Sequence, residues 1–165
     1  MVKKTLCIFL SVGMLFFCAR AFAEVFISPQ EAIKEMFPDY KEHKLETHTI
    51  DEQKIDIFRV FSDSKLIGWA AALNEKGMKE PITFLAGIDL EGRVKDVYVL
   101  EYREPHGFEI KEKSFTGQFQ GKTVESPIEV GGDIDAVTKA TISSKSAALA
   151  VKKALIVIND LRKDA

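Results

Sequence analysis

Four short apolar runs joined by polar turns occupy the middle of this chain. They are Ile55 to Phe61, Leu66 to Leu73, Ile82 to Leu90 and Arg93 to Tyr102. Branched and aromatic residues fill the runs, and turn residues such as Glu91-Gly92 separate them. Runs of this length with short connections are typical of strands that pair with their neighbours in the sequence. The sequence therefore predicts an antiparallel sheet.

One helix is predicted before this sheet and one after it. Ser28, Pro29 and Glu31 form a helix start with a capping box, and Pro38 ends that helix. Near the C-terminus, apolar residues recur at helical spacing: Ala147, Val151, Ala154, Leu155, Ile158 and Leu161. A helix, a sheet and a closing helix predict an α+β fold in which both helices pack on the sheet.

The remaining segments have weaker patterns. The polar stretch from Asp39 to Gln53 predicts a loop or an irregular strand, and we interpret its His43 and His48 as surface residues rather than metal ligands. The stretch from Arg103 to Gly132 predicts irregular structure, with a short helix near Phe115 to Phe119. Trp69 lies in an apolar run and is expected in the core.

The first 23 residues are typical of a signal peptide. Lys3 and Lys4 precede the apolar run Leu6 to Phe17, and Ala21-Phe22-Ala23 offers a small-x-small cleavage site. We expect cleavage after Ala23 and a periplasmic or otherwise extracytoplasmic protein. The alternative is an uncleaved segment that anchors the protein in the membrane.

Composition narrows the function of residues 24–165, which are expected to form a single domain. Both cysteines, Cys7 and Cys18, lie in the predicted signal peptide, so the exported chain has no disulfide, cysteine nucleophile or cysteine-linked cofactor. Removing Lys3, Lys4 and Arg20 leaves 20 basic against 25 acidic residues, a net charge of −5 with histidines neutral. That charge argues against nucleic acid as a partner.

Hydroxyl side chains gather just before the C-terminal helix. Gly131-Gly132 supply a permissive turn, and the hydroxyl residues that follow are Thr138, Thr141, Ser143 and Ser144. A helix N-terminus offers unpaired N–H donors and the positive end of a dipole, which suit a phosphate. Local physics alone favours simple capping of the helix by these hydroxyls and leaves phosphate binding open.

Two blocks of residues resemble the FMN-binding domain family, whose members include flavin-carrying components of the sodium-pumping NADH:quinone oxidoreductase and of the Rnf complex, and the flavin domain of NosR. Asp135, Thr138, Ala140 and Thr141 match the flavinylation motif of that family, while Lys139 replaces its usual Gly. Upstream, Glu104 to Ile110 resembles the family's Glu-Thr-Pro-Gly loop, with His106 where Pro is usual. The residues that resemble its Gln-Phe-x-Gly-Lys segment are Gln118, Phe119, Gly121 and Lys122.

The resemblance implies FMN bound covalently through a phosphoester to Thr141, a bond made from FAD by a separate flavin transferase with a divalent metal. It implies that Asp135 serves recognition or activation by the transferase. It also implies that Thr138 shapes the loop and hydrogen-bonds the phosphate. Ser143 and Ser144 are expected to cap the helix near the phosphate, beside Ala140. Glu104, Gly107 and Phe108 are expected to approach the flavin ring.

Three functions remain open at this point. The first is an electron carrier that relays between a redox-protein donor and acceptor, such as a cytochrome or a membrane electron-transfer complex. The second is an FMN-dependent extracytoplasmic reductase. The third is a secreted binding module without flavin, in which Thr141 is only a helix cap. The residues near the predicted ring site favour the carrier, because His106 is the only one that titrates near neutral pH when unperturbed.

Overall fold

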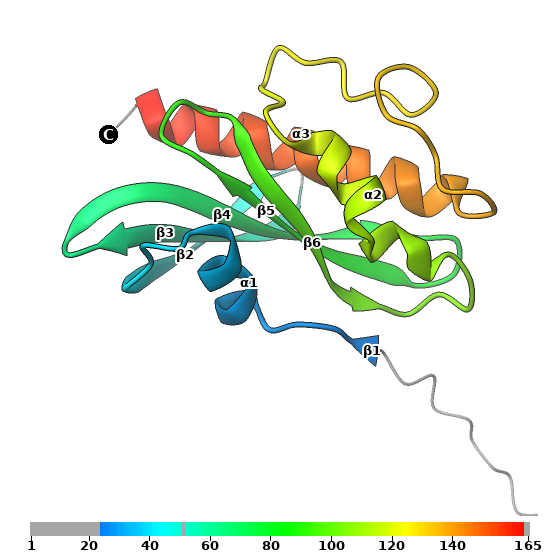
Figure 1. Cartoon of the computed structure of the whole chain (residues 1–165), viewed down its shortest axis with the longest axis horizontal. Helices are drawn as coiled ribbons and strands as arrows, with labels where there is room; N and C mark the ends of the chain where they lie inside the picture. Colours follow the sequence, from blue (N-terminus) through cyan, green and yellow to red (C-terminus); the bar gives the residue numbers. More distant parts are fainter. Residues whose placement is uncertain (1–23, 51, 164–165) are drawn as a thin grey trace, which may run out of the picture.

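The computed structural model describes residues 24–50 and 52–163, so the predicted signal peptide lies outside the described residues. Six strands form one antiparallel sheet in the order β1-β6-β5-β4-β3-β2 (Figure 1). The strands are β1 (Glu24–Val25), β2 (Glu42–Ile50), β3 (Gln53–Ser62), β4 (Lys65–Lys76), β5 (Pro81–Ile88) and β6 (Val94–Tyr102). The four strands expected from the apolar runs are confirmed as β3 to β6.

The edge strand β2 corrects the expectation of a loop or irregular strand between Asp39 and Gln53. It pairs regularly with β3, from Glu42 opposite Phe61 to Ile50 opposite Gln53. Its side chains are mostly exposed or half-buried, so it lacks the apolar pattern of the inner strands. An edge strand needs only one hydrogen-bonded neighbour and tolerates polar and charged side chains, which explains why its sequence resembles a loop.

Two helices cover opposite faces of the sheet, which confirms the α+β prediction. Helix α1 (Pro29–Met36) starts with the predicted capping box between Ser28 and Glu31. Its buried residues pack on one face of the sheet, against residues such as Phe58 and Leu85. Helix α3 (Thr141–Lys163) packs on the other face, where Trp69 belongs to the larger core as expected.

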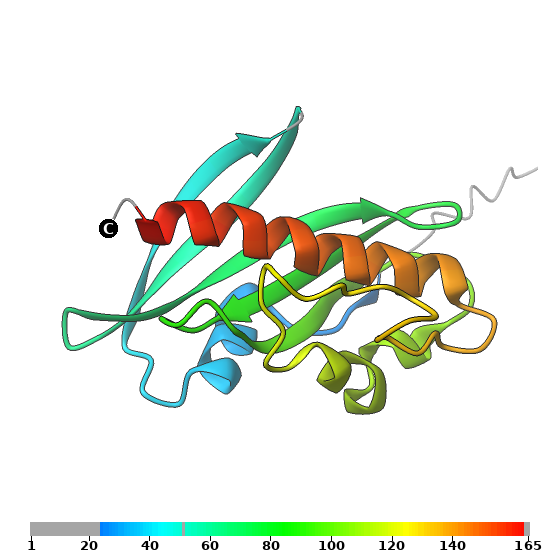
Figure 2. The same ribbon diagram turned by 90° about the horizontal axis from the view of Figure 1, so that it is seen from above.

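The segment between β6 and α3 contains three short helical turns and a long loop. The turns are η1 (Phe108–Lys111), α2 (Lys113–Thr116) and η2 (Gly117–Phe119), and the last two confirm the helix expected near Phe115 to Phe119. The loop then runs beside α3 and enters that helix at Thr141 (Figure 2). Among the described residues, no helix combines the length and apolar character needed to cross a membrane.

Candidate functional site

Helix α3 begins at Thr141, two or three residues before the serines that were expected to cap it. Its first intrahelical bond runs from the Ser144 amide to the Ala140 carbonyl, so the amides of residues 141 to 143 have no partner within the helix. The predicted caps are therefore wrong: Ser143 and Ser144 lie inside the first turn and are buried. The free amides make this end of α3 a region of positive potential.

The buried serines instead fasten the helix start to its surroundings. Ser144 Oγ donates to the Ala140 carbonyl at 3.0 Å and accepts from the Val137 amide at 3.1 Å. Ser143 Oγ lies 3.3 Å from the Tyr102 hydroxyl. Both serine hydroxyls are thus engaged within the protein, and neither is free to react with an external group.

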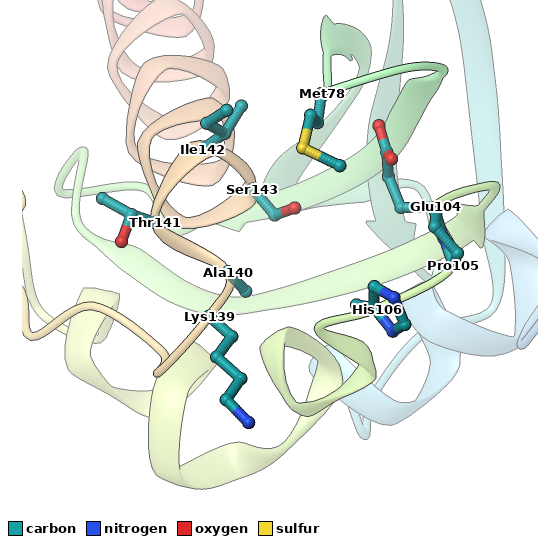
Figure 3. Close-up of a pocket in the computed structure, with 9 residues that line it drawn as sticks. All are labelled: Met78, Glu104, Pro105, His106, Lys139, Ala140, Thr141, Ile142 and Ser143. Carbon is teal, nitrogen blue, oxygen red and sulfur yellow. The ribbon is translucent and has the colours of Figure 1, made fainter.

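The two threonines of the hydroxyl-rich segment have the opposite character. Thr138 and Thr141 are exposed. Within the part of the chain that the structure describes, neither side chain takes part in a hydrogen bond. Figure 3 shows the Thr141 side chain on one side of the helix start and Ser143 pointing to the other, toward Glu104 and Met78. The Thr141 hydroxyl is therefore open to a large partner from outside.

The loop that follows β6 packs directly against the helix start. Gly107 has φ 90°, and a Cβ placed there would lie 2.5 Å from the Cβ of Ala140. The Tyr102 hydroxyl donates to the His106 carbonyl, which holds the loop in this position. Burial raises the pKa of Tyr102, so it stays a neutral donor. A glycine and an alanine from the two blocks thus meet in one contact that larger residues would break.

Glu104 is the one acidic side chain buried in this loop, with 4% of its surface exposed. Its Oε1 accepts from the amides of Lys79 and Glu80, at 2.6 and 3.0 Å, in the turn between β4 and β5. Its Oε2 is buried, and no residue in the described part of the chain hydrogen-bonds it. A buried carboxylate oxygen without a donor is costly, and such groups in a hollow are candidates for contact with a ligand.

These elements enclose a hollow of about 280 Å³. It is lined by Met78, Glu104, Pro105, His106, Lys139, Ala140, Thr141, Ile142 and Ser143 (Figure 3). Residues of both predicted blocks therefore line one hollow. Phe108 does not line it: the Phe108 ring packs on Tyr102, with 5.2 Å between centroids. Sequence reasoning missed Met78 and Tyr102, which carry no local signal beyond strand or turn character.

The Gln118 and Lys122 side chains hold the loop that carries Asp135. Gln118 accepts from the Asp135 amide at 2.7 Å and donates to the Asp135 carbonyl at 3.3 Å. Lys122 Nζ lies 2.5 Å from an oxygen of Asp133, which also accepts from two loop amides. These bonds, led by that from Lys122, lower the pKa of Asp133 to about 2. The Asp135 side chain itself remains exposed.

Lys139 occupies the position where the resembling family usually has Gly. Its φ is 63°, in the left-handed region that glycine adopts without strain. The loop therefore keeps the backbone that a glycine favours and places a lysine there, directly before the Ala140 contact.

Comparison with known proteins supports this interpretation of both blocks. Residues 77–156 match the model of the FMN-binding domain family. That range begins at the β4–β5 turn beside Glu104 and includes the loop, the hollow and most of α3. A search of curated proteins found no match.

Proposed function

This chain belongs to the FMN-binding domain family through residues 77–156, and we propose that it is an exported electron-transfer flavoprotein with FMN esterified to Thr141. FMN-binding domains hold a flavin, whose chemistry when bound is the reversible uptake of two electrons. One observation carries the choice of residue. Thr141 is an exposed hydroxyl at the first position of a long helix, beside free amides and the hollow lined by both blocks.

The attachment step is a phosphoryl transfer. The Thr141 hydroxyl oxygen attacks the flavin-side phosphorus of FAD, the pyrophosphate bond breaks, AMP leaves, and the hydroxyl proton passes to a base. A threonine hydroxyl is a weak nucleophile that needs such a base or a metal. We assign both to an external flavin transferase with a divalent metal, which requires that the acceptor oxygen be accessible.

The hydrogen bonds at the start of α3 reduce the number of hydroxyl groups that could compete with Thr141 for the flavin phosphate. Ser143 and Ser144 are buried and bonded, whereas Thr138 and Thr141 are exposed. Of these two, Thr141 begins the helix, so a phosphate on its oxygen lies nearest the free amides. Thr138 lies three residues earlier, in the loop, where it is placed to bond the phosphate rather than carry it.

The hollow fits part of a flavin. Its volume of about 280 Å³ lies at the lower limit of ordinary ligand sites, about 300–1,000 Å³. The buried Oε2 of Glu104 is an acceptor that needs a donor, and FMN offers donors in its ring imide and ribityl hydroxyls. A hollow of this size would leave part of the ring in solvent, where a redox partner could approach it.

We propose that Asp135 serves the transferase rather than the fold. Its backbone is fixed by Gln118, while its carboxylate is exposed. We expect Asp135→Ala to lower flavin loading without changing the melting temperature. Equal flavin loading of wild type and variant would show that Asp135 has no role in attachment. An unfolded variant would show that Asp135 has a structural role instead.

The attachment site is tested by co-expression with a flavin transferase and FAD. We expect yellow wild-type protein, no covalent flavin in Thr141→Ala, and partial loading in Thr141→Ser, which retains a hydroxyl. Thr138→Ala removes the loop hydroxyl but keeps the acceptor oxygen of Thr141, so it should still load, at or below the level of wild type. Loading that survives in Thr141→Ala but fails in Thr138→Ala would move the ester to Thr138.

The carrier role is tested with the loaded protein after chemical reduction. We expect fast electron transfer to other redox proteins and little change in His106→Ala, because His106 is an exposed residue at the rim of the hollow. Selective, saturable reduction of one small molecule that collapses in His106→Ala would favour a reductase. Export is tested separately by N-terminal sequencing, which should begin at Glu24.

A further inference from the structure

The exposed face of α3 carries a row of large apolar side chains. Ile142, Leu149 and Ile156 are 48%, 46% and 51% exposed. Their spacing of seven residues places them on one side of the helix, over about 21 Å at 1.5 Å per residue. We call this row the α3 stripe. A surface helix normally presents polar residues on its outer face, so an exposed apolar row of this kind is typical of a surface that binds a partner.

The loop beside α3 extends the stripe sideways. One hollow of about 510 Å³ lies between Leu149 and the loop residues Ile128 to Val130. A second hollow, of about 280 Å³, lies between Ile156 and Val124, another exposed apolar residue. Figure 2 shows this loop running along the helix for much of its length. The stripe is therefore flanked by recesses that side chains of a partner could enter.

Lysines separate the apolar residues of the stripe. Lys145 and Lys152 alternate with Ile142, Leu149 and Ile156, and Lys139 precedes Thr141 at the head of the helix. Among the described residues, none of these three lysines takes part in a salt bridge. The acids near this side include Glu129, which borders the larger hollow, and Glu125, which accepts from the Thr123 hydroxyl at 2.6 Å. Asp160 is exposed one turn after Ile156 and pairs with Lys163 at 3.2 Å. The stripe is locally basic on a chain whose net charge is −2.

This charge selects among possible occupants. In a twofold pairing of two α3 stripes about Leu149, Lys145 of one copy would approach Lys152 of the other, and like charges disfavour that contact. An acidic surface with an apolar centre matches both the lysines and the row between them. The stripe also starts one residue after Thr141, so a protein that covers it lies beside the proposed flavin.

We propose that the α3 stripe is the docking surface for an acidic redox protein that exchanges electrons with the flavin. The proposal rests on the proposed function for the flavin, but the docking itself needs only the folded chain. A fully reduced flavin on Thr141 would supply two electrons, which two one-electron acceptors such as ferric haems would take up, and its two protons would pass to solvent. Acidic groups on the partner meet Lys145 and Lys152, and its apolar centre covers Leu149.

The probe is a small basic cytochrome c, used as such and after succinylation of its lysines, which reverses its charge and keeps its haem. Docking is first measured without flavin. The isotopically labelled apoprotein is titrated with each cytochrome, and amide NMR shifts are mapped. We expect the succinylated form to shift residues 139–156 and to lose this effect as salt rises. Shifts confined to other surfaces, or stronger binding of the basic form, would overturn the proposal.

Electron transfer is then measured by stopped flow with the reduced, loaded protein. At low salt, Lys145→Glu with Lys152→Glu should slow reduction of the succinylated cytochrome on the order of tenfold or more. The matched control is Lys41→Glu with Lys65→Glu, exposed lysines outside α3 that lie just before β2 and at the start of β4. Leu149→Ser is compared with Leu45→Ser on β2. Equal effects of stripe and control variants would contradict the docking surface.

Two further outcomes would also contradict it. Self-association of the apoprotein that Leu149→Ser abolishes would make a second copy the occupant. Binding of the apoprotein to vesicles of anionic lipid, lost in the Lys145 and Lys152 variant, would make it a membrane contact. If the apoprotein docks as expected but no flavin attaches to Thr141, the docking surface stands and the proposed function fails.

Discussion

Replacing Gly107 by Ala tests whether the contact between the two blocks organises the site. Gly107 has φ 90°, and the added Cβ would lie 2.5 Å from the Ala140 Cβ and 2.9 Å from the Tyr102 hydroxyl. The left-handed backbone costs a non-glycine residue about 1–2 kcal/mol. Forcing a methyl group into packed surroundings adds about 1–3 kcal/mol. We therefore expect the free energy of unfolding to fall by about 2–5 kcal/mol.

Gly131→Ala is a closely matched control. Gly131 has φ 89°, but no atom of the described residues lies within 4 Å of the added Cβ. Its variant therefore has the free-energy cost of the left-handed backbone without a steric clash. Both variants reduce the freedom of the unfolded chain equally, and that effect cancels in the comparison. Urea unfolding should show Gly107→Ala to be less stable than Gly131→Ala by about 1–3 kcal/mol.

The same comparison extends to flavin loading. Gly107→Ala should lower covalent loading, because the methyl group pushes the Glu104 loop away from Ala140 and Thr141. Adding Ala140→Gly removes the facing methyl group and should recover part of the stability and loading. If Gly107→Ala lowers the free energy of unfolding no more than Gly131→Ala does, the contact between the two blocks is not tight and the reasoning is refuted.

Three other substitutions test single features of the site. Lys139→Gly should raise the free energy of unfolding by up to about 1 kcal/mol, because relief of the left-handed strain exceeds the entropy cost of glycine. Asp133→Asn should flatten the fall of stability between pH of about 4 and 2. The folded pKa of Asp133 lies below the unfolded value, so its contribution is present above that window and is lost on acidification. Glu104→Gln should raise the midpoint potential of the loaded protein, because a carboxylate beside the ring disfavours added electrons.

Each of these expectations has its own check. Lys145→Gly, within α3, should instead lower the free energy of unfolding by about 1 kcal/mol. The same decrease in Lys139→Gly would show that the backbone of Lys139 is not strained. For Asp133→Asn, the free energy of unfolding is measured by urea unfolding at each pH. If its fall on acidification matches that of wild type, Asp133 does not contribute to the pH dependence of stability. Glu104→Gln keeps an acceptor for the turn amides, so an unchanged potential with normal folding would place the ring outside the hollow.

The fold could be predicted where buried elements produce a recognisable pattern of apolar residues in the sequence. The inner strands are covered on both faces, so their apolar runs are long, and α1 carries its own capping signal. Strand β2 was missed because an exposed edge strand needs no apolar pattern. The two-residue β1 was missed because only pairing with Glu101 and Tyr102 makes it a strand.

The site was predicted in part, for a different physical reason. Motif residues such as Ala140 and Thr141 could be located in the sequence, but their neighbours depend on tertiary register. Met78 lies in a turn between strands and lines the hollow only through the tertiary fold. Tyr102 has the sequence character of an ordinary strand residue, and only the structure shows that its hydroxyl lies beside Ser143. The wrong cap at Ser143 or Ser144 arose because any serine near a helix start suits capping, and only burial shows that these two lie inside it.

The most direct test of the account is the mass of the denatured protein after co-expression with a flavin transferase, followed by peptide mapping. Denaturation removes any bound flavin that is not covalent. The account predicts a gain of one FMN less one water, located on the peptide that contains Thr141. An unmodified mass in a host whose transferase loads another FMN-binding domain, or flavin found on a different residue, would contradict it.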